Sequence, residues 1–247
     1  MSKRYFMRLA YCGANFHGWQ RQPNGVTVQS AIEDALETIL RRPVPVTGAG
    51  RTDAGVNART MIAHLDLDDG VDPGPRFVAA LNALVGRDIA IYELREVAPD
   101  AHARFDATER TYHYYAHTGK NPFDYRLSWQ MPEGLDVDAM NRAAAMLVGR
   151  RDFTSFSKLH TDVKTNICDL RRAGWESLGD GRYRFVITAD RFLRNMVRAV
   201  VGTLVDVGRG KMKPEDIMKI VECRDRCAAG TSMPAHALFL WDVKYPY

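Results

Sequence analysis

The chain has 247 residues, of which 46% are hydrophobic and 26% charged, and its formal net charge is +4. These values are typical of a soluble globular protein with one large domain or two small ones. No stretch approaches the ~18 uninterrupted apolar residues of a membrane span, and Arg8 interrupts the first residues too early for the apolar core of a signal peptide. We therefore expect no membrane partner and a cytoplasmic location.

The four cysteines are few and scattered, at positions 12, 168, 223 and 227. Cys223 and Cys227 would share one face of a helix, but no second pair of the metal-binding type accompanies them, so we expect reduced thiols and no metal site. Arginine makes up 26 of the 34 basic residues. Guanidinium groups bind phosphates bidentately and stack on bases, which favours a nucleic-acid partner, although a GC-rich genome would produce the same bias.

The first half of the chain predicts alternating strands and helices. In chain order these are a strand, a helix, two strands, a helix and a strand, over residues 3–12, 28–42, 44–47, 60–67, 75–84 and 89–97. Thr27 can cap the first helix and Pro43 ends it. The order β-α-β-β-α-β is the ferredoxin-like pattern.

The second half repeats this pattern more loosely. The expected elements are a strand, a helix, two strands, two helices and a final strand, over residues 110–118, 137–149, 167–178, 182–189, 192–207, a short stretch after Pro214, and 238–244. Gly179-Asp180-Gly181 predicts a hairpin between the two middle strands. We therefore expect an α+β protein of two similar halves, residues 1–105 and 106–247, with an active-site cleft where they meet.

The segment Gly48-Ala49-Gly50-Arg51-Thr52-Asp53-Ala54-Gly55-Val56 connects two of the expected strands. Its glycines allow a positive φ and a close approach of the backbone to a ligand, so Asp53 is presented rather than packed. No Gly-Lys-Ser/Thr follows, which excludes a phosphate loop of the Walker type. A hairpin with a solvated carboxylate is the ordinary alternative.

Two further segments combine aromatic and polar residues. Residues 11–22 form a loop after the first strand, and residues 102–107 lead into an aromatic strand. Alternation in that strand places Tyr112 and Tyr114 on one face, with His113 and Tyr115 on the other. Core packing is the default interpretation for at least one of these faces.

The expected helix near residue 200 carries arginines at positions 191, 194 and 198, which would form a basic stripe. Such a stripe is usually a solvated face. Arg198 differs because Val197, Ala199 and Val200 surround it, so its charged group requires a specific acidic partner.

Taken together, these segments resemble the TruA class of tRNA pseudouridine synthases. The matching patterns are YxGxxFxGWQ, GRTDAGV, HARFxA followed by RxYxY, DFTSF and FLxxMVRxxVGTLxxVG, in the order of the family and nearly end to end. The resemblance implies two ferredoxin-like halves that form one continuous, mixed and mainly antiparallel sheet flanked by helices. It also implies a homodimer that isomerises uridine in the anticodon arm of tRNA, as tRNA pseudouridine(38–40) synthases do, without a cofactor.

The resemblance also implies roles for particular residues. Asp53 would be the catalytic carboxylate, either as nucleophile at C1′ or as proton acceptor at C2′, and Arg198 its cationic neighbour. The residues expected to bind substrate are Tyr112, which stacks on the uracil, Leu238, which closes its other face, Arg51, which fills the space of the flipped base, and Arg104, His102 and Lys164. From their position in polar segments next to these motifs, rather than from the resemblance, we expect Arg104, Lys164 and the loop with Arg21 to contact phosphates.

The sequence departs from the family pattern at three positions. Asn57 stands where a histidine is usual, Ala101 replaces a common phenylalanine, and Ala237 replaces a glycine. None of these positions is a residue with an expected catalytic role.

Two other functions remain open at this point. A noncatalytic RNA-binding protein of the RRM type would share the ferredoxin-like sheet, but its aromatic motifs are absent and it would leave Asp53 unexplained. A metal-dependent hydrolase could use Asp66, Asp68, Asp69 and Asp72, but no histidine stands at ligand spacing from them.

Overall fold

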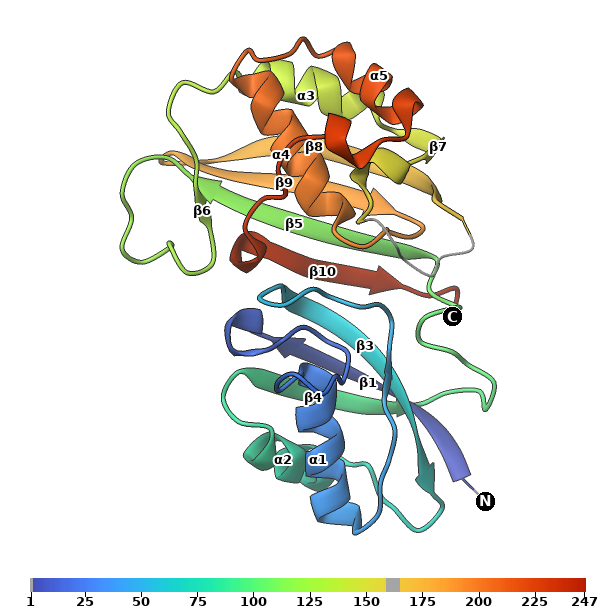
Figure 1. The fold of residues 1–247 in the computed structure, drawn as a ribbon. Coiled ribbons are helices and arrows are strands. Elements are labelled where there is room, and N and C mark those ends of the chain that lie inside the picture. Colours follow the sequence, from blue (N-terminus) through green and yellow to red (C-terminus); the bar gives the residue numbers. More distant parts are fainter. Residues whose placement is uncertain (1, 159–164) are drawn as a thin grey trace. The chain divides into compact units, whose positions relative to one another are not determined.

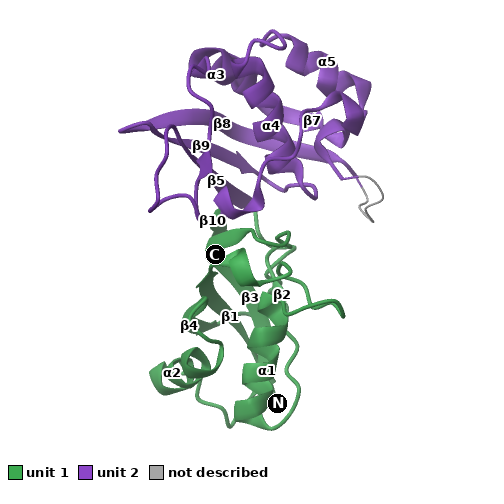
Figure 2. Ribbon diagram, turned by 60° about the vertical axis from the view of Figure 1, so that its left-hand side comes forward, with its two compact units in different colours: residues 1–108, 240–247 green, residues 109–239 purple. Residues whose placement is uncertain are grey.

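The computed structural model describes residues 2–158 and 165–247. The chain divides into two compact units: residues 1–108 with 240–247 are unit 1, and residues 109–239 are unit 2 (Figure 2). The sequence-based division assigns the last eight residues to the second half, whereas here they group with unit 1.

Unit 1 follows the predicted β-α-β-β-α-β order (Figure 1). Its elements are β1 (Ser2–Tyr11), α1 (Val28–Leu40), β2 (Thr47–Gly48), β3 (Asn57–Asp68), α2 (Pro75–Leu84) and β4 (Ile89–Glu96). β1 lies between β3 and β4 and is antiparallel to both, and β2 pairs with β3. α1 contacts α2, and α2 packs against β4.

The first helix begins at a capping box. The Ser30 N–H donates to the Thr27 hydroxyl at 3.1 Å, and the Thr27 N–H donates to the Ser30 hydroxyl at 3.0 Å. Arg41 adopts a left-handed conformation (φ 58°) and ends the helix at Leu40, two residues earlier than predicted. The buried side of α1 consists of Val28, Ile32, Ala35 and Leu36, as the helical spacing predicted.

The strand predicted over residues 44–47 is wrong for residues 44–46, because only Thr47–Gly48 pairs with a neighbouring strand. Pro43 and Pro45 lack backbone donors, which disfavours a ladder here. The Val46 N–H donates instead to the Glu33 carboxylate at 3.0 Å. Val46 is nevertheless buried, which explains why its hydrophobicity suggested a strand. Its backbone N–H is satisfied by the Glu33 side chain and not by a neighbouring strand.

Unit 2 contains a second set of strands and helices. Its elements are β5 (Glu109–His117), β6 (Trp129–Gln130), α3 (Val137–Met146), β7 (Gly149–Asp152), β8 (Ile167–Gly179), β9 (Arg182–Ala189), α4 (Met196–Gly208), α5 (Asp216–Cys223) and the start of β10 (Leu238–Lys244). The strand order β5-β9-β8-β7 is antiparallel throughout, and β6 runs parallel to β5. α3 packs against β8 and α4 (Figure 1).

Local backbone chemistry explains where unit 2 agrees with the sequence and where it does not. The predicted hairpin between β8 and β9 is confirmed, with φ of 82°, 51° and 68° at Gly179, Asp180 and Gly181. α4 begins at Met196 rather than at residue 192, because Asn195 is left-handed (φ 66°) and cannot continue a helix. α5 ends at Cys223, so the shared helical face predicted for Cys223 and Cys227 is wrong.

Within the described residues, ten mostly antiparallel strands and five α-helices confirm the predicted α+β class. β6 and β7, of two and four residues, were not predicted. Such short strands carry too few side chains to show a period of two.

Candidate active site

Asp53 lies between β2 and β3 on a segment whose backbone is fixed by the loop after β1. The Trp19 N–H donates to the Thr52 carbonyl at 3.1 Å, and the Gly55 N–H donates to the Phe16 carbonyl at 3.3 Å. These bonds hold the residues on both sides of Asp53 from outside its own turn. The carboxylate therefore stands on a backbone held on both sides, which is the condition for positioning a reacting group.

Two glycines of the neighbouring loop make this contact possible. A Cβ at Gly13 would overlap the carbonyl of Val56, and a Cβ at Gly18 would lie 2.6 Å from the carbonyl oxygen of Thr52. Gly18 also has a φ of 87°, which other residues rarely adopt. The motifs at residues 11–22 and 48–56 are thus one structure.

The departure at Asn57 belongs to the same structure. Its side chain is 1% exposed, and its Oδ1 accepts from the Gly13 N–H at 2.8 Å. The side-chain amide therefore satisfies a buried donor where the two loops meet. Asn57 therefore stabilises the contact between the two loops, and its buried side chain is not exposed to a substrate.

Asp53 is partly exposed and the neighbouring Arg51 is exposed. The Val56 N–H donates to the Asp53 carbonyl at 3.1 Å, and Gly55 supplies the positive φ (79°) of this turn. The turn presents the Asp53 side chain while its backbone is satisfied. This is the arrangement predicted from the glycine pattern.

His102 organises the loop that precedes β5. Its Nδ1 accepts from the backbone N–H groups of Arg104 and Phe105 at 3.1 and 3.3 Å, and the backbone N–H of His102 donates to the Asp106 carboxylate at 2.7 Å. The imidazole is therefore part of the loop's hydrogen bonding, which indicates a role in positioning the exposed Arg104. The Phe105 ring packs on His102 at 4.2 Å between centroids, yet Phe105 is 75% exposed.

A second imidazole, that of His64, also forms a hydrogen bond to this loop. His64 is buried in β3, its Nδ1 accepts from the Ala103 N–H at 3.1 Å, and its ring meets that of His102 edge-on at 4.6 Å. Burial lowers the pKa of His64 to about 4, and the positive charges near it act in the same direction. His64 is thus neutral near pH 7 and can accept this hydrogen bond.

The departure at Ala101 fits its surroundings. Ala101 is buried with Phe6 and Ala103, against partly buried Tyr245. The Phe6 and Tyr245 rings lie 5.0 Å apart. The aromatic volume here is supplied by these two rings, both from unit 1.

In unit 2, Tyr112 and Tyr114 have different roles although they share one face of β5. Tyr112 is partly exposed, and its ring meets Phe192 edge-on at 5.0 Å. Tyr114 is fully buried, its hydroxyl has no hydrogen-bond partner among the residues that the structure describes, and burial raises its pKa far above 10. Tyr112 is thus the tyrosine of this face that is open to a ligand, and Tyr114 is core.

Arg198 lies in the first turn of α4 and is half-buried. Its Nε donates to the Met233 carbonyl at 2.5 Å, and its own carbonyl accepts from the Met233 N–H at 3.1 Å. These bonds fix the direction of the guanidinium within unit 2. A guanidinium carries five N–H donors in a planar fork, which is the geometry that suits a carboxylate or a phosphate.

The predicted helical stripe of arginines is wrong. Arg191 and Arg194 precede the first residue of α4, so they do not share a helical face with Arg198. Arg194 is exposed, and the Arg191 N–H donates to Asp190 at 2.7 Å. Arg198 is thus set apart from the other two by its place on the helix.

The remaining predicted residues lie near the end of the chain or outside the description. Leu238 is buried at the start of β10, and Ala237 before it is fully buried. Lys164 lies outside the described residues. Arg21, expected to contact phosphate, donates to Glu33 and Asp34 at 2.7 Å each, so carboxylates already occupy its guanidinium.

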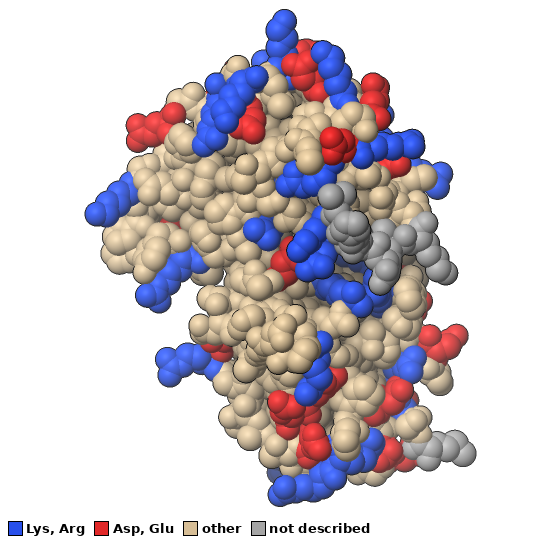
Figure 3. Space-filling view, in the orientation of Figure 1, with Lys and Arg blue, Asp and Glu red and all other residues tan. Residues whose placement is uncertain are grey.

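Many other basic groups of unit 1 are also paired. On the face seen in Figure 3, blue basic and red acidic side chains are interleaved over unit 1. Arg4 and Arg42 bind Asp66 and Asp68, two carboxylates of the run considered for a metal-dependent hydrolase. Asp72 accepts from the Gly74 N–H at 3.0 Å. Among the described residues, no group of three or more His, Cys, Asp or Glu side chains could hold a metal ion.

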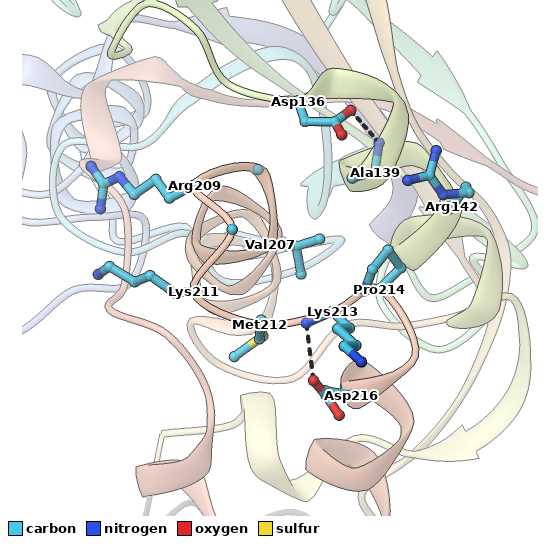
Figure 4. A pocket seen from close by; sticks show the side chains of 12 residues that line it. Asp136, Ala139, Arg142, Val207, Arg209, Lys211, Met212, Lys213, Pro214 and Asp216 are labelled. Carbon is cyan, nitrogen blue, oxygen red and sulfur yellow. Dashed lines mark hydrogen bonds between the residues drawn. The ribbon is translucent and has the colours of Figure 1, made fainter.

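A hollow of about 720 Å³ lies within unit 2, where the beginnings of α3 and α5 meet the end of α4 (Figure 4). Its charged lining comprises Arg142, Arg209, Lys211, Lys213, Asp136 and Asp216. The two carboxylates accept from backbone N–H groups of Ala139 and Lys213, at 2.8 and 2.9 Å. No predicted site residue that the structure describes lines this hollow.

Comparison with known proteins decides the family. The sequence profile described as tRNA pseudouridine synthase matches residues 8–106 and 143–246. The chain belongs to this family. It is 56% identical to tRNA pseudouridine synthase A of Parabacteroides distasonis over 99% of this chain and 96% of that protein. It is 55% identical to the enzyme of the same name from Bacteroides thetaiotaomicron, over 99% and 91% of the two chains.

Membership of the tRNA pseudouridine synthase family confirms the resemblance and the isomerase class predicted from the sequence. Exiguobacterium sibiricum has a more distant relative, also called tRNA pseudouridine synthase A, at 37% identity over 99% of this chain and 97% of that protein. Among the helices that the structure describes, none is long and apolar enough to cross a membrane.

Proposed function

We propose that this protein isomerises uridine to pseudouridine in the anticodon arm of tRNA, with Asp53 as the reacting carboxylate. The observation that carries the proposal is the construction around Asp53: two motifs lock together so that one partly exposed carboxylate stands on a fixed backbone. The family profile covers this whole region. The names of the relatives support tRNA as the substrate.

The reaction breaks the bond between N1 of uracil and C1′, turns the base and rejoins it through C5. It consumes no electrons and adds no atoms, so one carboxylate that acts at the sugar is sufficient covalent machinery. In this proposal the partly exposed Tyr112 stacks on the uracil and Leu238 closes its other face. Arg198 is the cation beside the reacting carboxylate, and its bond to Met233 holds it in one direction.

The target uridine leaves its stack to reach Asp53. Extrusion of a base costs a few kcal/mol, and less in a loop or at the end of a stem, which favours a target beside the anticodon loop. The exposed Arg51, two residues from Asp53, can fill the vacated space. We propose Arg104, Lys164 and His102 as the remaining substrate-binding residues, and a homodimer in which the second copy holds the body of the tRNA.

The test is incubation of the purified protein with unmodified tRNA, followed by mapping of pseudouridine along the sequence. We expect pseudouridine within the anticodon arm. Pseudouridine only at other positions would contradict the proposed target, and binding without any isomerisation would favour the RRM-like alternative. Equal turnover with and without EDTA would exclude the hydrolase-like use of a metal.

A further inference from the structure

The segment from Gly119 to Leu127, which connects β5 to β6, exposes three large apolar side chains. We refer to it as the Phe123 loop. Phe123 is 92% exposed, Tyr125 54% and Leu127 45%. In Figure 1 this loop projects from the strands of unit 2, away from α3 and α5. Clustered exposed apolar groups of this kind usually mark an interaction site.

The Phe123 loop is held by its own hydrogen bonds. The Asn121 side chain donates to Asp124 at 2.7 Å and accepts from the Phe123 N–H at 2.9 Å. The Leu127 N–H donates to the Asp124 carbonyl at 2.9 Å. The exposed ring of Phe123 is therefore displayed by a folded loop rather than by a loose one.

Both ends of the loop are tied to unit 2. Before it, the Thr118 N–H donates to the Gly181 carbonyl at 2.8 Å. After it, the Ser128 hydroxyl lies 2.9 Å from Nδ1 of the buried His117, and His236 lies 3.3 Å from the Ser128 carbonyl. The loop thus has a defined base on the sheet, and a ligand on Phe123 would be held in a fixed direction.

The polar groups of the loop suit an anionic partner. Arg126 donates to the Tyr125 hydroxyl at 2.8 Å and its guanidinium lies 5.5 Å from the centre of that ring. Lys120 is exposed at the start of the loop. The carboxylate of Asp124 is engaged by Asn121. The loop therefore displays the Phe123 ring beside the Lys120 cation and beside the Arg126 cation, which lies against the Tyr125 ring.

We propose that the Phe123 loop stacks an unpaired base of the RNA substrate on the Phe123 ring, with Lys120 and Arg126 at the adjacent phosphates. Aromatic rings interleaved with cations are how proteins hold single-stranded RNA. That the RNA is tRNA rests on the proposed function, whereas the argument for base stacking comes from the structure of the Phe123 loop alone. No motif used in the proposed reaction lies in residues 119–127.

A second copy of the chain is a less suitable partner for this surface. Three exposed side chains are far fewer than the roughly 20–30 residues that each partner contributes to a stable interface. If two copies met through the same loop, the Lys120 and Arg126 of both would face one another. A nucleobase requires only one open ring face and is accompanied by negative charge.

Three substitutions at Phe123 test the proposal, with fluorescence anisotropy of labelled, unmodified tRNA as the measurement. Stacking is worth ~1–3 kcal/mol per base, so Phe123→Ala should weaken binding by about 5-fold to 150-fold. Phe123→Leu keeps the apolar area but lacks the ring, and should be as weak as Phe123→Ala. Phe123→Trp should bind like the unaltered protein, and its additional fluorescence should be quenched when tRNA binds.

The matched control is Leu178→Ala, which removes another exposed apolar side chain of unit 2 and should leave binding unchanged. Turnover at saturating tRNA should be unchanged in Phe123→Ala, since this loop does not touch the reacting atoms.

Three outcomes would contradict these proposals. Binding of tRNA by Phe123→Leu as tight as that of the unaltered protein would overturn stacking. A halved mass of Phe123→Ala in light scattering would assign the loop to a protein interface. If the unaltered protein forms no pseudouridine but its binding of tRNA still depends on Phe123, the proposed function would be contradicted and the stacking proposal would stand.

Discussion

The two units fix their candidate residues in different ways. In unit 1, Asp53 is held through the backbone, because glycines let the loop at residues 13–19 bond to the segment on both sides of it. In unit 2, Tyr112 and Arg198 stand on regular elements and are held through their side chains, by Phe192 and by the Met233 carbonyl. Substitution of a neighbouring glycine should therefore matter most in unit 1, and substitution of the side chain itself in unit 2.

The largest effect should come from Asp53→Asn, which keeps the shape of the side chain but removes the charge. We expect turnover to fall below detection, because an amide is neither the nucleophile nor the proton acceptor that the reaction needs. The affinity for tRNA should stay within about tenfold, ~1.4 kcal/mol. A tritium-release assay gives turnover and a filter-binding assay gives affinity. Near-normal turnover would remove Asp53 from the mechanism.

The backbone half of the comparison is tested with two glycines. Gly13→Ala places a Cβ against the Val56 carbonyl, whereas a Cβ at Gly50, in the Asp53 segment itself, meets nothing within 4 Å. We expect Gly13→Ala to lower the free energy of unfolding by about 1–3 kcal/mol and to reduce turnover, because the two loops must separate. Gly50→Ala should do neither. Urea denaturation measures the free energy of unfolding, and initial rates measure turnover. Equal values for the two variants would contradict the idea that the backbone contact between the loops positions Asp53.

The side-chain half is tested at Arg198. Arg198→Ala should lower turnover by about tenfold or more, ~1.4 kcal/mol, while Arg182→Ala, an exposed arginine on β9, should have little effect. If Arg198 stabilises a charged group of the reaction, its loss should also move the acidic limb of the pH–rate profile to higher pH. Equal rates for the two variants would reduce Arg198 to a structural residue.

The same contrast explains what the sequence could reveal. Long elements with clear periodicity, such as α1 and β8–β9, were predicted to within about two residues, because burial and turn chemistry act locally. Asp53 was singled out because its segment is rich in glycine and because the motifs on either side of it match those of the family, and its catalytic role stays a prediction. The start of α4 was missed because the conformation of Asn195 is fixed by a distant residue: its side chain donates to Ser232 at 2.6 Å.

The locking of residues 11–22 onto residues 48–56 could not be predicted either, since the contact joins segments that are far apart in sequence. A local signal did exist for the Phe123 loop. Pro122 and Asn121 mark a turn, and three large apolar residues at positions 123, 125 and 127 alternate with charged ones. That alternation resembles a half-buried strand, and only the exposed fractions distinguish the two.

The smallest effect on turnover should come from the loop at residues 101–107, which is held by imidazoles rather than by glycines. The pKa of His64 is about 4 in the folded protein and near 6.5 when unfolded, so below pH 6.5 the unfolded chain takes up a proton that the folded protein does not. The free energy of unfolding should therefore fall as the pH is lowered from about 6.5 to about 4, with a slope of at most ~1.4 kcal/mol per pH unit from this group. His113, also with a pKa of about 4, contributes in the same direction from unit 2.

His64→Asn isolates this contribution, because an amide oxygen can still accept from the Ala103 N–H but does not titrate. Urea denaturation at several pH values should give a shallower slope for His64→Asn than for the unaltered protein, while the exposed His17→Asn should leave the slope as it is. Identical slopes for all three proteins would mean that His64 does not sense pH. A shallower slope for His64→Asn, with unchanged turnover at pH 7, would show that the neutral His64 imidazole stabilises this loop. The Asp53 segment, in contrast, is held by backbone contacts.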